Sequence, residues 1–348
     1  MPTVITWSKT HTMSMENIEV NIKSTISDTA KIFQQVKASL SQEIFGQEKL
    51  VDRLLMALLA HGHLLVEGAP GLAKTTAIKA LADRLEGDFK RIQFTPDLLP
   101  SDLTGTEIYR AQTGDFEFQR GPLFHNLILA DEVNRAPAKV QSALLEAMGE
   151  QQITIGSTTY ALPKLFLVMA TQNPIEQEGT YPLPEAQLDR FQMHVAIDYP
   201  DVHTEKDILK LAQDRDKDGY KKPVKDSAYL TQENVFKAQQ QVLNLYVAPN
   251  LQDYMVELIL ATRNPAKYDK QLAAMINYGG SPRATIALDR CARALAFLRG
   301  RDHLLPEDIH NVIHDVLRHR LILSFEAEVE GVTPDDIIDR LLKIVPIS

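Results

Sequence analysis

Eight consecutive residues, 68–75, have the types and spacing that bind phosphate: Gly-Ala-Pro-Gly-Leu-Ala-Lys-Thr. They follow an apolar run and precede a predicted helix, which is where a phosphate-binding loop occurs. Small residues let consecutive backbone N–H groups point at phosphate oxygens, and the helix N-terminus adds the positive end of its dipole. Lys74 is expected to contact the β- and γ-phosphates, and the Thr75 hydroxyl to bind Mg²⁺. The residues expected to surround the phosphates are Gly68, Ala69, Pro70, Gly71, Leu72, Ala73, Lys74, Thr75 and Thr76.

A pair of adjacent carboxylates strengthens this interpretation. Ala73 departs from the usual pattern, which has glycine before the lysine, so an ordinary glycine-rich turn is the alternative. However, Asp131 and Glu132 end a second apolar run, and doubly wound sheets bind ligands at the carboxyl ends of their strands. Asp131 can hold Mg²⁺, and Glu132 can polarise a water for attack on the γ-phosphate. Taken alone, the pair could be a solvated strand end.

Three further polar residues lie where they could complete such a site. Asn173 follows a third apolar run and could orient the attacking water, although turn chemistry before Pro174 is the alternative. Arg283 stands in the first turn of a predicted helix, where the macrodipole disfavours a cation. A nucleotide phosphate would compensate it, and a surface ion pair is the alternative. Arg190 is either a partner for Asp189 or Glu185, or an arginine finger for the nucleotide of a neighbouring subunit.

The elements that must position these residues form an α/β pattern. Short apolar runs separated by helical stretches predict five buried parallel strands, at 63–67, 90–94, 128–131, 165–170 and 193–197. Helical spacing of apolar residues covers 29–59, interrupted by a turn at 44–47, and helices are also predicted at 75–85 and 138–149. Period-two alternation around Gly114 and Gly156 predicts β-hairpins over 106–120 and 152–162.

The pattern of charged and apolar residues changes after Pro200. A charged stretch, 214–226, predicts a linker or exposed loop, and from Thr231 onward the apolar spacing is helical. Prolines at 282, 306 and 334 stand at the expected first turns of three helices. We therefore expect a loose N-terminal segment (1–27), a doubly wound α/β domain (28–200), a linker (201–230) and a smaller all-helical domain (231–348).

Composition excludes several classes of protein. The chain has 348 residues and a formal charge of -9, which argues against bulk attraction to nucleic acid or anionic lipid. Its single cysteine, Cys291, excludes an internal disulfide and is expected in the core. No apolar stretch is long enough for a membrane helix and no signal peptide is recognisable, so a cytoplasmic location is expected. His310 and His314 lack the glutamate of a zinc protease helix and are expected on a solvated face.

Five segments together resemble the MoxR family of AAA+ ATPases: GAPGLAKT, LILADEVNRAP, MATQNP, YPLPEAQLDRF and GSPRA, in that order. The resemblance implies an AAA+ core with inserted hairpins and a helical lid, and alanine at position 73 is normal in that family. It assigns Lys74 and Thr75 to Walker A, Asp131 and Glu132 to Walker B, and Asn173 to sensor 1. Arg190 matches the trans-acting finger and Arg283 matches sensor 2. Ile44 and Gln47 belong to the segment that abuts the adenine.

The same resemblance implies a function. Family members form rings, commonly hexameric, that hydrolyse ATP to ADP and phosphate with Mg²⁺. They act as chaperone-like machines on protein clients such as metalloenzymes, often beside partners with a von Willebrand factor A domain. The alternative is a nucleic-acid motor related to minichromosome-maintenance helicases, but the segment 152–162 contains no Lys or Arg. A GTP switch would need an Asn-Lys-x-Asp motif, which is absent from the sequence, and a dead scaffold would lack catalytic residues that this chain retains.

Overall fold

A parallel sheet of five strands forms the centre of the α/β domain in the computed structural model, which describes residues 28–112, 114–174, 179–218 and 229–347. The strands are β1 (Leu64–Gly68), β2 (Phe89–Gln93), β5 (Leu127–Asp131), β8 (Leu167–Gln172) and β9 (Met193–Ile197). Their order is β2-β5-β8-β1-β9, and every pair is parallel. The prediction of a doubly wound sheet is confirmed, with β8 two residues later than expected.

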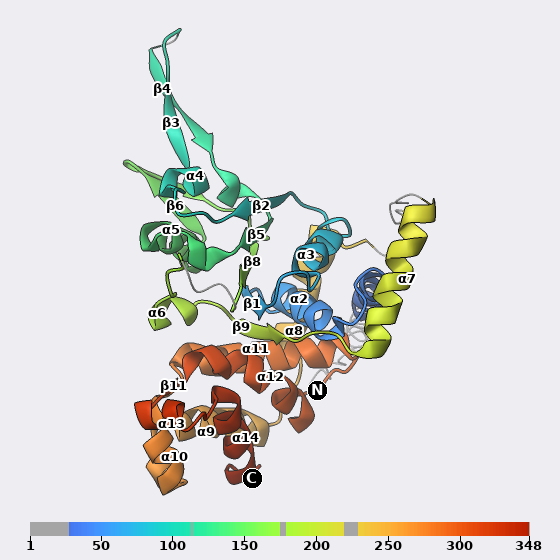
Figure 1. The fold of residues 1–348 in the computed structure, drawn as a ribbon, viewed down its shortest axis with the longest axis vertical. Coiled ribbons are helices and arrows are strands. Elements are labelled where there is room, and N and C mark those ends of the chain that lie inside the picture. The colour runs from blue at the N-terminus through green and yellow to red at the C-terminus, as the bar shows by residue number, and fades with distance from the viewer. Residues whose placement is uncertain (1–27, 113, 175–178, 219–228, 348) are drawn as a thin grey trace, which may run out of the picture.

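Both faces of the sheet are buried, which explains why its central strands are apolar throughout. Along β1, Leu64 and Val66 belong to one hydrophobic cluster, whereas Leu65 belongs to the other. The helix over residues 28–41, α2 (Glu48–Leu59) and α3 (Lys74–Ala82) supply the first cluster, and α5 (Ala138–Glu150) supplies the second. Figure 1 shows α3 and α5 on opposite sides of the sheet.

Two β-hairpins are inserted into this core, as predicted. The first consists of β3 (Gly105–Arg110) and β4 (Asp115–Arg120), between α4 (Pro100–Thr104) and the short helix η1 (Pro122–Phe124). The second consists of β6 (Gln152–Ile155) and β7 (Thr158–Ala161), directly after α5. Figure 1 shows the β3–β4 hairpin projecting far from the sheet, where it can contact other molecules.

The predicted linker is partly helical. Residues 202–218 form α7 (Val202–Asp218), which lies at the edge of the α/β domain in Figure 1. The α7 helix is tied to the core at its start, where Thr204 packs against Gly46. Residues 219–228, which include the remainder of the charged stretch, and the predicted N-terminal segment 1–27 lie outside the described residues.

The C-terminal domain is helical except for one short pair of strands, which corrects the expectation of an all-helical domain. The antiparallel strands β10 (Ile276–Tyr278) and β11 (Ile322–Leu323) join two distant segments of it. Three helices begin at the predicted prolines, and Ser281 and Thr333 cap two of them through their hydroxyl groups. The helices are α8 (Gln232–Asn244), α9 (Pro249–Arg263), α10 (Lys270–Met275), α11 (Pro282–Leu298), α12 (Pro306–Leu317), α13 (Phe325–Val329) and α14 (Pro334–Ile344).

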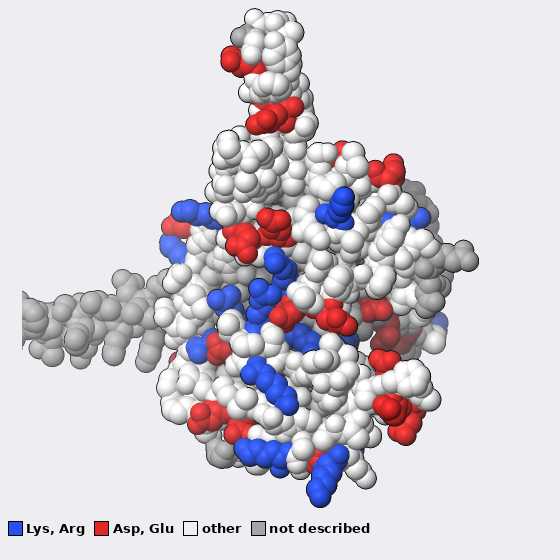
Figure 2. Space-filling model, turned by 90° about the vertical axis from the view of Figure 1, so that its left-hand side faces the viewer, with Lys and Arg blue, Asp and Glu red and all other residues white. Residues whose placement is uncertain are grey.

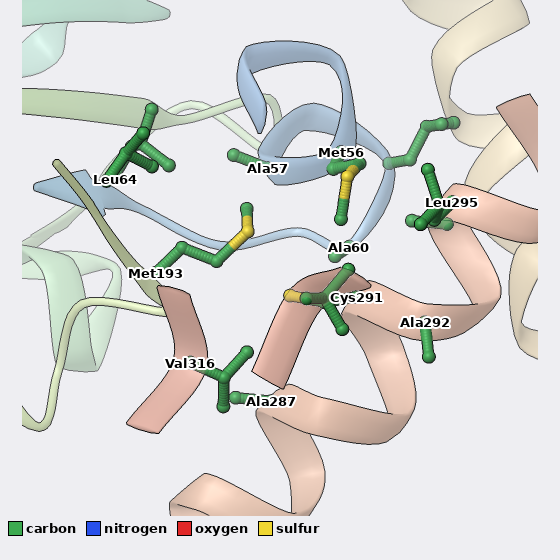
Figure 3. Close-up of a cluster of buried hydrophobic side chains, with 14 of the residues drawn as sticks. Met56, Ala57, Ala60, Leu64, Met193, Ala287, Cys291, Ala292, Leu295 and Val316 are labelled. Atoms are coloured by element: carbon green, nitrogen blue, oxygen red, sulfur yellow. The ribbon is translucent and has the colours of Figure 1, made fainter. Parts of the chain in front are cut away.

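The two domains share one hydrophobic core. Figure 3 shows the buried Cys291 of α11 among side chains from α2, β1, β9 and α12, including Met56, Met193 and Val316. Burial raises the pKa of the Cys291 thiol to about 12, so this cysteine acts as a small apolar residue. An ion pair between Arg53 of α2 and Asp315 of α12, with an N–O distance of 2.7 Å, reinforces the same junction. The position of α11 is therefore set by extensive packing against the α/β domain.

His63, directly before β1, is a buried structural residue that should make the free energy of unfolding depend on pH. Its Nδ1 accepts from the N–H of Val168 and its Nε2 donates to the carbonyl of Met148, which fixes the neutral ring. Burial lowers its pKa from 6.5 to about 4. The unfolded state therefore binds a proton that the folded state excludes, and stability falls as pH falls from about 6.5 to 4.

We expect His63 to contribute a loss of about 2 kcal/mol in unfolding free energy between pH 7.5 and pH 5. Urea unfolding of the wild type and His63→Gln at both pH values measures this contribution. The pH-dependent loss should be smaller in the variant by that amount. An equal loss in both proteins would contradict the assignment.

Candidate nucleotide site

The carboxyl edge of the sheet brings together the residues that sequence analysis assigned to phosphate and metal chemistry. The loop 69–73 follows β1, Asp131 ends β5 with Glu132 directly after it, and Asn173 follows β8. These strands are adjacent in the order β5-β8-β1, and Glu67 is paired with Gln172. Loop, carboxylates and amide therefore surround one point at this edge, as expected for a doubly wound sheet.

The loop has the backbone shape of a phosphate cradle. Gly71 and Ala73 have φ values of 84° and 55°, in the left-handed region that favours glycine. Alanine at position 73, in place of the usual glycine, therefore carries a modest local strain. Ala73 is the residue directly before α3, so the helix itself begins with ordinary geometry. The Nζ of Lys74 donates to the carbonyl oxygens of Gly68, at 2.5 Å, and Gln172, at 3.4 Å. The ammonium group thus lies between the loop and the end of β8.

The electrostatics of Lys74 reflect its position among acids. Partial burial lowers its pKa, while the charges of Asp131, Glu132 and Glu67 act in the opposite direction. Glu67 itself lies 2.8 Å from the Nε2 of His194 on β9, and this contact lowers the pKa of the carboxyl. Lys74 therefore faces several carboxylates, and anionic phosphates bound beside them need further positive charge.

Asp131 is held by two partners that sequence analysis did not identify. The buried hydroxyl of Thr171, on β8, donates to its Oδ1 at 2.6 Å. Arg91, on β2, donates to its Oδ2 at 2.7 and 3.1 Å. Both contacts fix the orientation of the carboxylate at the strand end.

Glu132 is positioned by its backbone and by β2. Its φ of 57° is unusual for a residue with a side chain, and its N–H donates to the Thr171 hydroxyl. Its carboxylate accepts from the amide of Gln93 at 2.8 Å and from Arg135 at 3.1 Å. The register that pairs Gln93 with Asp131 explains this contact. β2 is the edge strand of the sheet and is largely exposed, so its polar residues gave no signal of a site, and the sequence did not reveal that β5 is its neighbour.

Three further predicted residues are buried, whereas Pro70, Gly71 and Thr76 of the loop and first helical turn are exposed. Asn173 is 7% exposed and directly follows Gln172, whose carbonyl accepts from Lys74. Ile44 and Gln47 are also buried, in the turn between the helix over residues 28–41 and α2. Their contact with an adenine stays a prediction.

Mg²⁺ fits the oxygen donors available here. The hydroxyl of Thr75, on the first turn of α3, and the carboxylate of Asp131 are hard oxygen ligands, and Mg²⁺ is commonly bound by one or two carboxylates plus substrate phosphates. Among the described residues, no group of three or more His, Cys, Asp or Glu could hold a metal alone. The donor set therefore suits a cation that arrives with a phosphate ligand.

Arg190 lies away from this edge. Its Nη1 donates to the carbonyl of Leu145 on α5 at 2.6 Å, and Gly149 leaves room for the guanidinium, since an added Cβ would lie 2.3 Å from it. The alternative that Arg190 pairs with Asp189 is not observed, because Asp189 binds Arg320 at 2.7 Å instead. Arg190 precedes β9, so it is at the amino edge of the sheet.

Arg283 is also at the amino edge, which corrects its expected contact with the nucleotide of its own chain. Its Nη1 is 3.8 Å from Asp189, and the hydroxyl of Ser281 donates to the same carboxylate at 2.8 Å. Asp189 precedes β9, whereas the phosphate loop follows β1 at the opposite end, where Gly68 is paired with Ile197. Because α11 is fixed by the shared core, Arg283 faces outward beside Arg190.

The other residues considered in the sequence, His310, His314 and Cys291, contact protein groups and lie outside the nucleotide site. His310 is hydrogen-bonded to the hydroxyl of Tyr254, and His314 lies 3.0 Å from Asp339. Each imidazole therefore has its own protein partner. Cys291 is buried, as predicted. Within the described residues, no helix combines the length and apolar character needed to cross a membrane.

Comparisons with known proteins agree with this arrangement. Residues 63–193 match the family profile of the "ATPase family associated with various cellular activities (AAA)", and residues 270–341 match that of the AAA lid domain. The chain is 45% identical to Chaperone MoxR1 of Mycobacterium tuberculosis, covering 87% of this chain and 78% of that protein. It is 33% identical to Protein MoxR of Paracoccus denitrificans, covering 93% and 98%.

The solved structures include a similar fold. The crystal structure of an inferred ATPase from Cytophaga hutchinsonii superposes with a TM-score of 0.87 at 45% identity, covering 97% of this chain and 99% of that one. Fold, motifs and sequence identity over most of both chains lead to the same assignment. This chain belongs to the MoxR family of AAA ATPases.

Proposed function

We propose that this protein hydrolyses ATP to ADP and phosphate and uses the cycle to remodel a protein client. The observation that carries the proposal is the assembly of Lys74, Asp131 and Glu132 at one edge of the sheet, with the carboxylates held by Thr171, Arg91 and Gln93. A phosphate loop alone would support nucleotide binding. An oriented carboxylate beside it supports hydrolysis.

Each residue has one role in the chemistry. The loop N–H groups and Lys74 bind the phosphates. Thr75 and Asp131 would hold Mg²⁺, which would offset negative charge on the phosphate oxygens. Glu132 accepts a proton from the attacking water, and Asn173 orients that water. The proton stays on the Glu132 carboxyl until phosphate leaves.

Charge neutralisation in the transition state needs guanidinium groups that are not already paired with the carboxylates of the site, as Arg91 and Arg135 are. Arg190 and Arg283 are at the amino edge, separated from the phosphate loop by the length of β1, which is about 17 Å for five residues. We therefore assign both to the nucleotide of an adjacent copy. A ring of copies satisfies this requirement for every site, and a hexamer is the expected size from the family resemblance.

A protein client fits the exposed surface better than a nucleic acid does. On the β3–β4 hairpin, Tyr109 and Phe116 are 57% and 68% exposed, with their ring centroids 5.3 Å apart. Arg110 of this hairpin is paired with Glu117, and Figure 2 shows acidic side chains on the projecting hairpin. Apolar rings and neutralised charge favour protein contacts over phosphate contacts. Chaperone MoxR1 is named for such a role. An adaptor with a von Willebrand factor A domain remains part of the proposal.

Phosphate release tests the hydrolysis directly. The purified protein should release phosphate from ATP with Mg²⁺, at a rate within the usual range of about 10⁻² to 10² per second for P-loop enzymes and kinases. Chelation by EDTA should abolish the release. Lys74→Ala, which removes the phosphate-binding ammonium, should reduce it to background. Release that persists in both conditions would contradict the assignment.

A further inference from the structure

A cavity of about 510 Å³ lies at the amino edge of the sheet, between the α/β domain and the lid. Its walls are the loop before β1, the end of α5, residues 189–192, and the facing sides of α8 and α11. Figure 2 shows basic side chains gathered where the two domains meet on this face. The arginines that line the cavity are Arg190, Arg283, Arg290, Arg293 and Arg320.

The acids near these arginines neutralise only part of their charge. Asp189 is the acid in the cavity wall, and Arg320 binds it at 2.7 Å. Arg293 pairs with Asp289 on its own helix, at 2.8 Å. Of the remaining three, Arg283 lies 3.8 Å from the same Asp189, while Arg190 and Arg290 pair with no carboxylate among the described residues, so positive charge is left for an additional anion. The whole chain has a net charge of -9, so this excess of positive charge is a local feature of the cavity.

Arg290 stands out among these three. It follows Arg283 by seven residues on α11, two helical turns along the same face, and is half-buried. Within the described part of the chain, no carboxylate pairs with it. Burial and, to a smaller degree, the charge of Arg290 lower the pKa of His61 on the facing wall. The guanidinium therefore lies close to the cavity interior, where a charge without a counterion is costly.

We propose that Arg290 is a third phosphate-contacting arginine, which the cavity presents with Arg190 and Arg283 to the polyphosphate of ATP bound by an adjacent copy. This inference rests on the proposed function. Three guanidinium groups match the several negative charges of a triphosphate, and their planar N–H forks suit phosphate oxygens. The phosphate loop of the same chain is excluded as the source, because it is at the other end of β1.

Subunit mixing tests whether Arg290 acts on a neighbour. Arg290→Gln should bind a fluorescent ATP analogue like the wild type, because its own phosphate loop is intact. Its kcat should fall at least tenfold, and Arg290→Lys should recover part of the rate. Mixing Arg290→Gln with the inactive Lys74→Ala should raise turnover severalfold, because the second chain supplies an intact Arg290 to the phosphate loop of the first.

Controls separate this inference from the proposed function. Lys343→Gln removes an exposed charge of the lid and should keep the wild-type rate. Mixing Arg190→Ala with Lys74→Ala shows that chains exchange and complement. If that mixture regains turnover but the Arg290→Gln mixture does not, Arg290 does not act on the neighbour. A wild-type rate in Arg290→Gln would also overturn the inference. If the wild type itself releases no phosphate, the proposed function fails instead.

Discussion

Replacing Glu132 by glutamine should lower kcat by about 10²–10⁴, the usual contribution of a general base, while ATP binding stays close to that of the wild type. The carboxylate is held by Gln93 and Arg135 and lies just beyond the strand end that carries Asp131. Glutamine has nearly the same shape, but its amide cannot accept the proton of the attacking water. The phosphate loop and Lys74 remain intact, so affinity for ATP should not change.

Two measurements separate these effects. Steady-state phosphate release gives kcat, and titration with a fluorescent ATP analogue gives the dissociation constant. Glu326→Gln, on the exposed side of α13, is a matched control that should behave like the wild type. Turnover by Glu132→Gln at the wild-type rate would show that another group accepts the proton.

Replacing Arg190 by alanine should reduce turnover by about 10³ or more, as for the arginine fingers of other nucleotide hydrolases. ATP binding should remain, because the side chain is at the edge opposite the phosphate loop of its own chain. The substitution removes the guanidinium that lies beside Gly149, and it leaves no buried charge without a partner.

A second variant changes the surroundings of the same guanidinium and keeps the arginine. Gly149→Ala places a Cβ against the Arg190 side chain and should displace it, lowering kcat without removing the charge. Sedimentation of both variants should show assemblies of the wild-type size. Full turnover by Arg190→Ala would exclude it as a residue that stabilises the transition state.

Much of the fold could be predicted from the sequence because its signals are local. Each buried strand is a short apolar run, and the residues predicted to bind or hydrolyse the nucleotide lie at the ends of three of these runs. In a parallel sheet the carboxyl ends meet at one edge, so Lys74, Asp131 and Asn173 could be placed near each other without coordinates. The hairpins were predictable for the same reason, since alternation and turn residues are local patterns.

The residues that hold the carboxylates could not be predicted, because they depend on strand order. Thr171 contacts Asp131 because β8 lies beside β5, and Gln93 contacts Glu132 because β2 pairs with β5 on the other side. The sequence does not state these neighbours. Thr171 lies on β8, and its hydroxyl joins the two acids by donating to Asp131 and accepting from the N–H of Glu132.

The position of Arg283 depends on contacts between the domains. The sequence predicts that Arg283 of the second domain contacts a nucleotide phosphate. The core around Cys291 and the ion pair between Arg53 and Asp315 instead fix α11 against the amino edge of the sheet. Arg53 and Asp315 are 262 residues apart, and no local pattern predicts such a contact. Helix α7 was missed because its charged sequence resembles a linker.

In the mechanism that we propose, hydrolysis occurs at sites that adjacent copies complete. Phosphate release per chain, measured across a wide range of protein concentration beside sedimentation velocity, tests it most directly. We predict that the rate per chain rises with concentration in step with the fraction of assembled protein. A rate per chain that stays constant while the protein is monomeric would contradict the account.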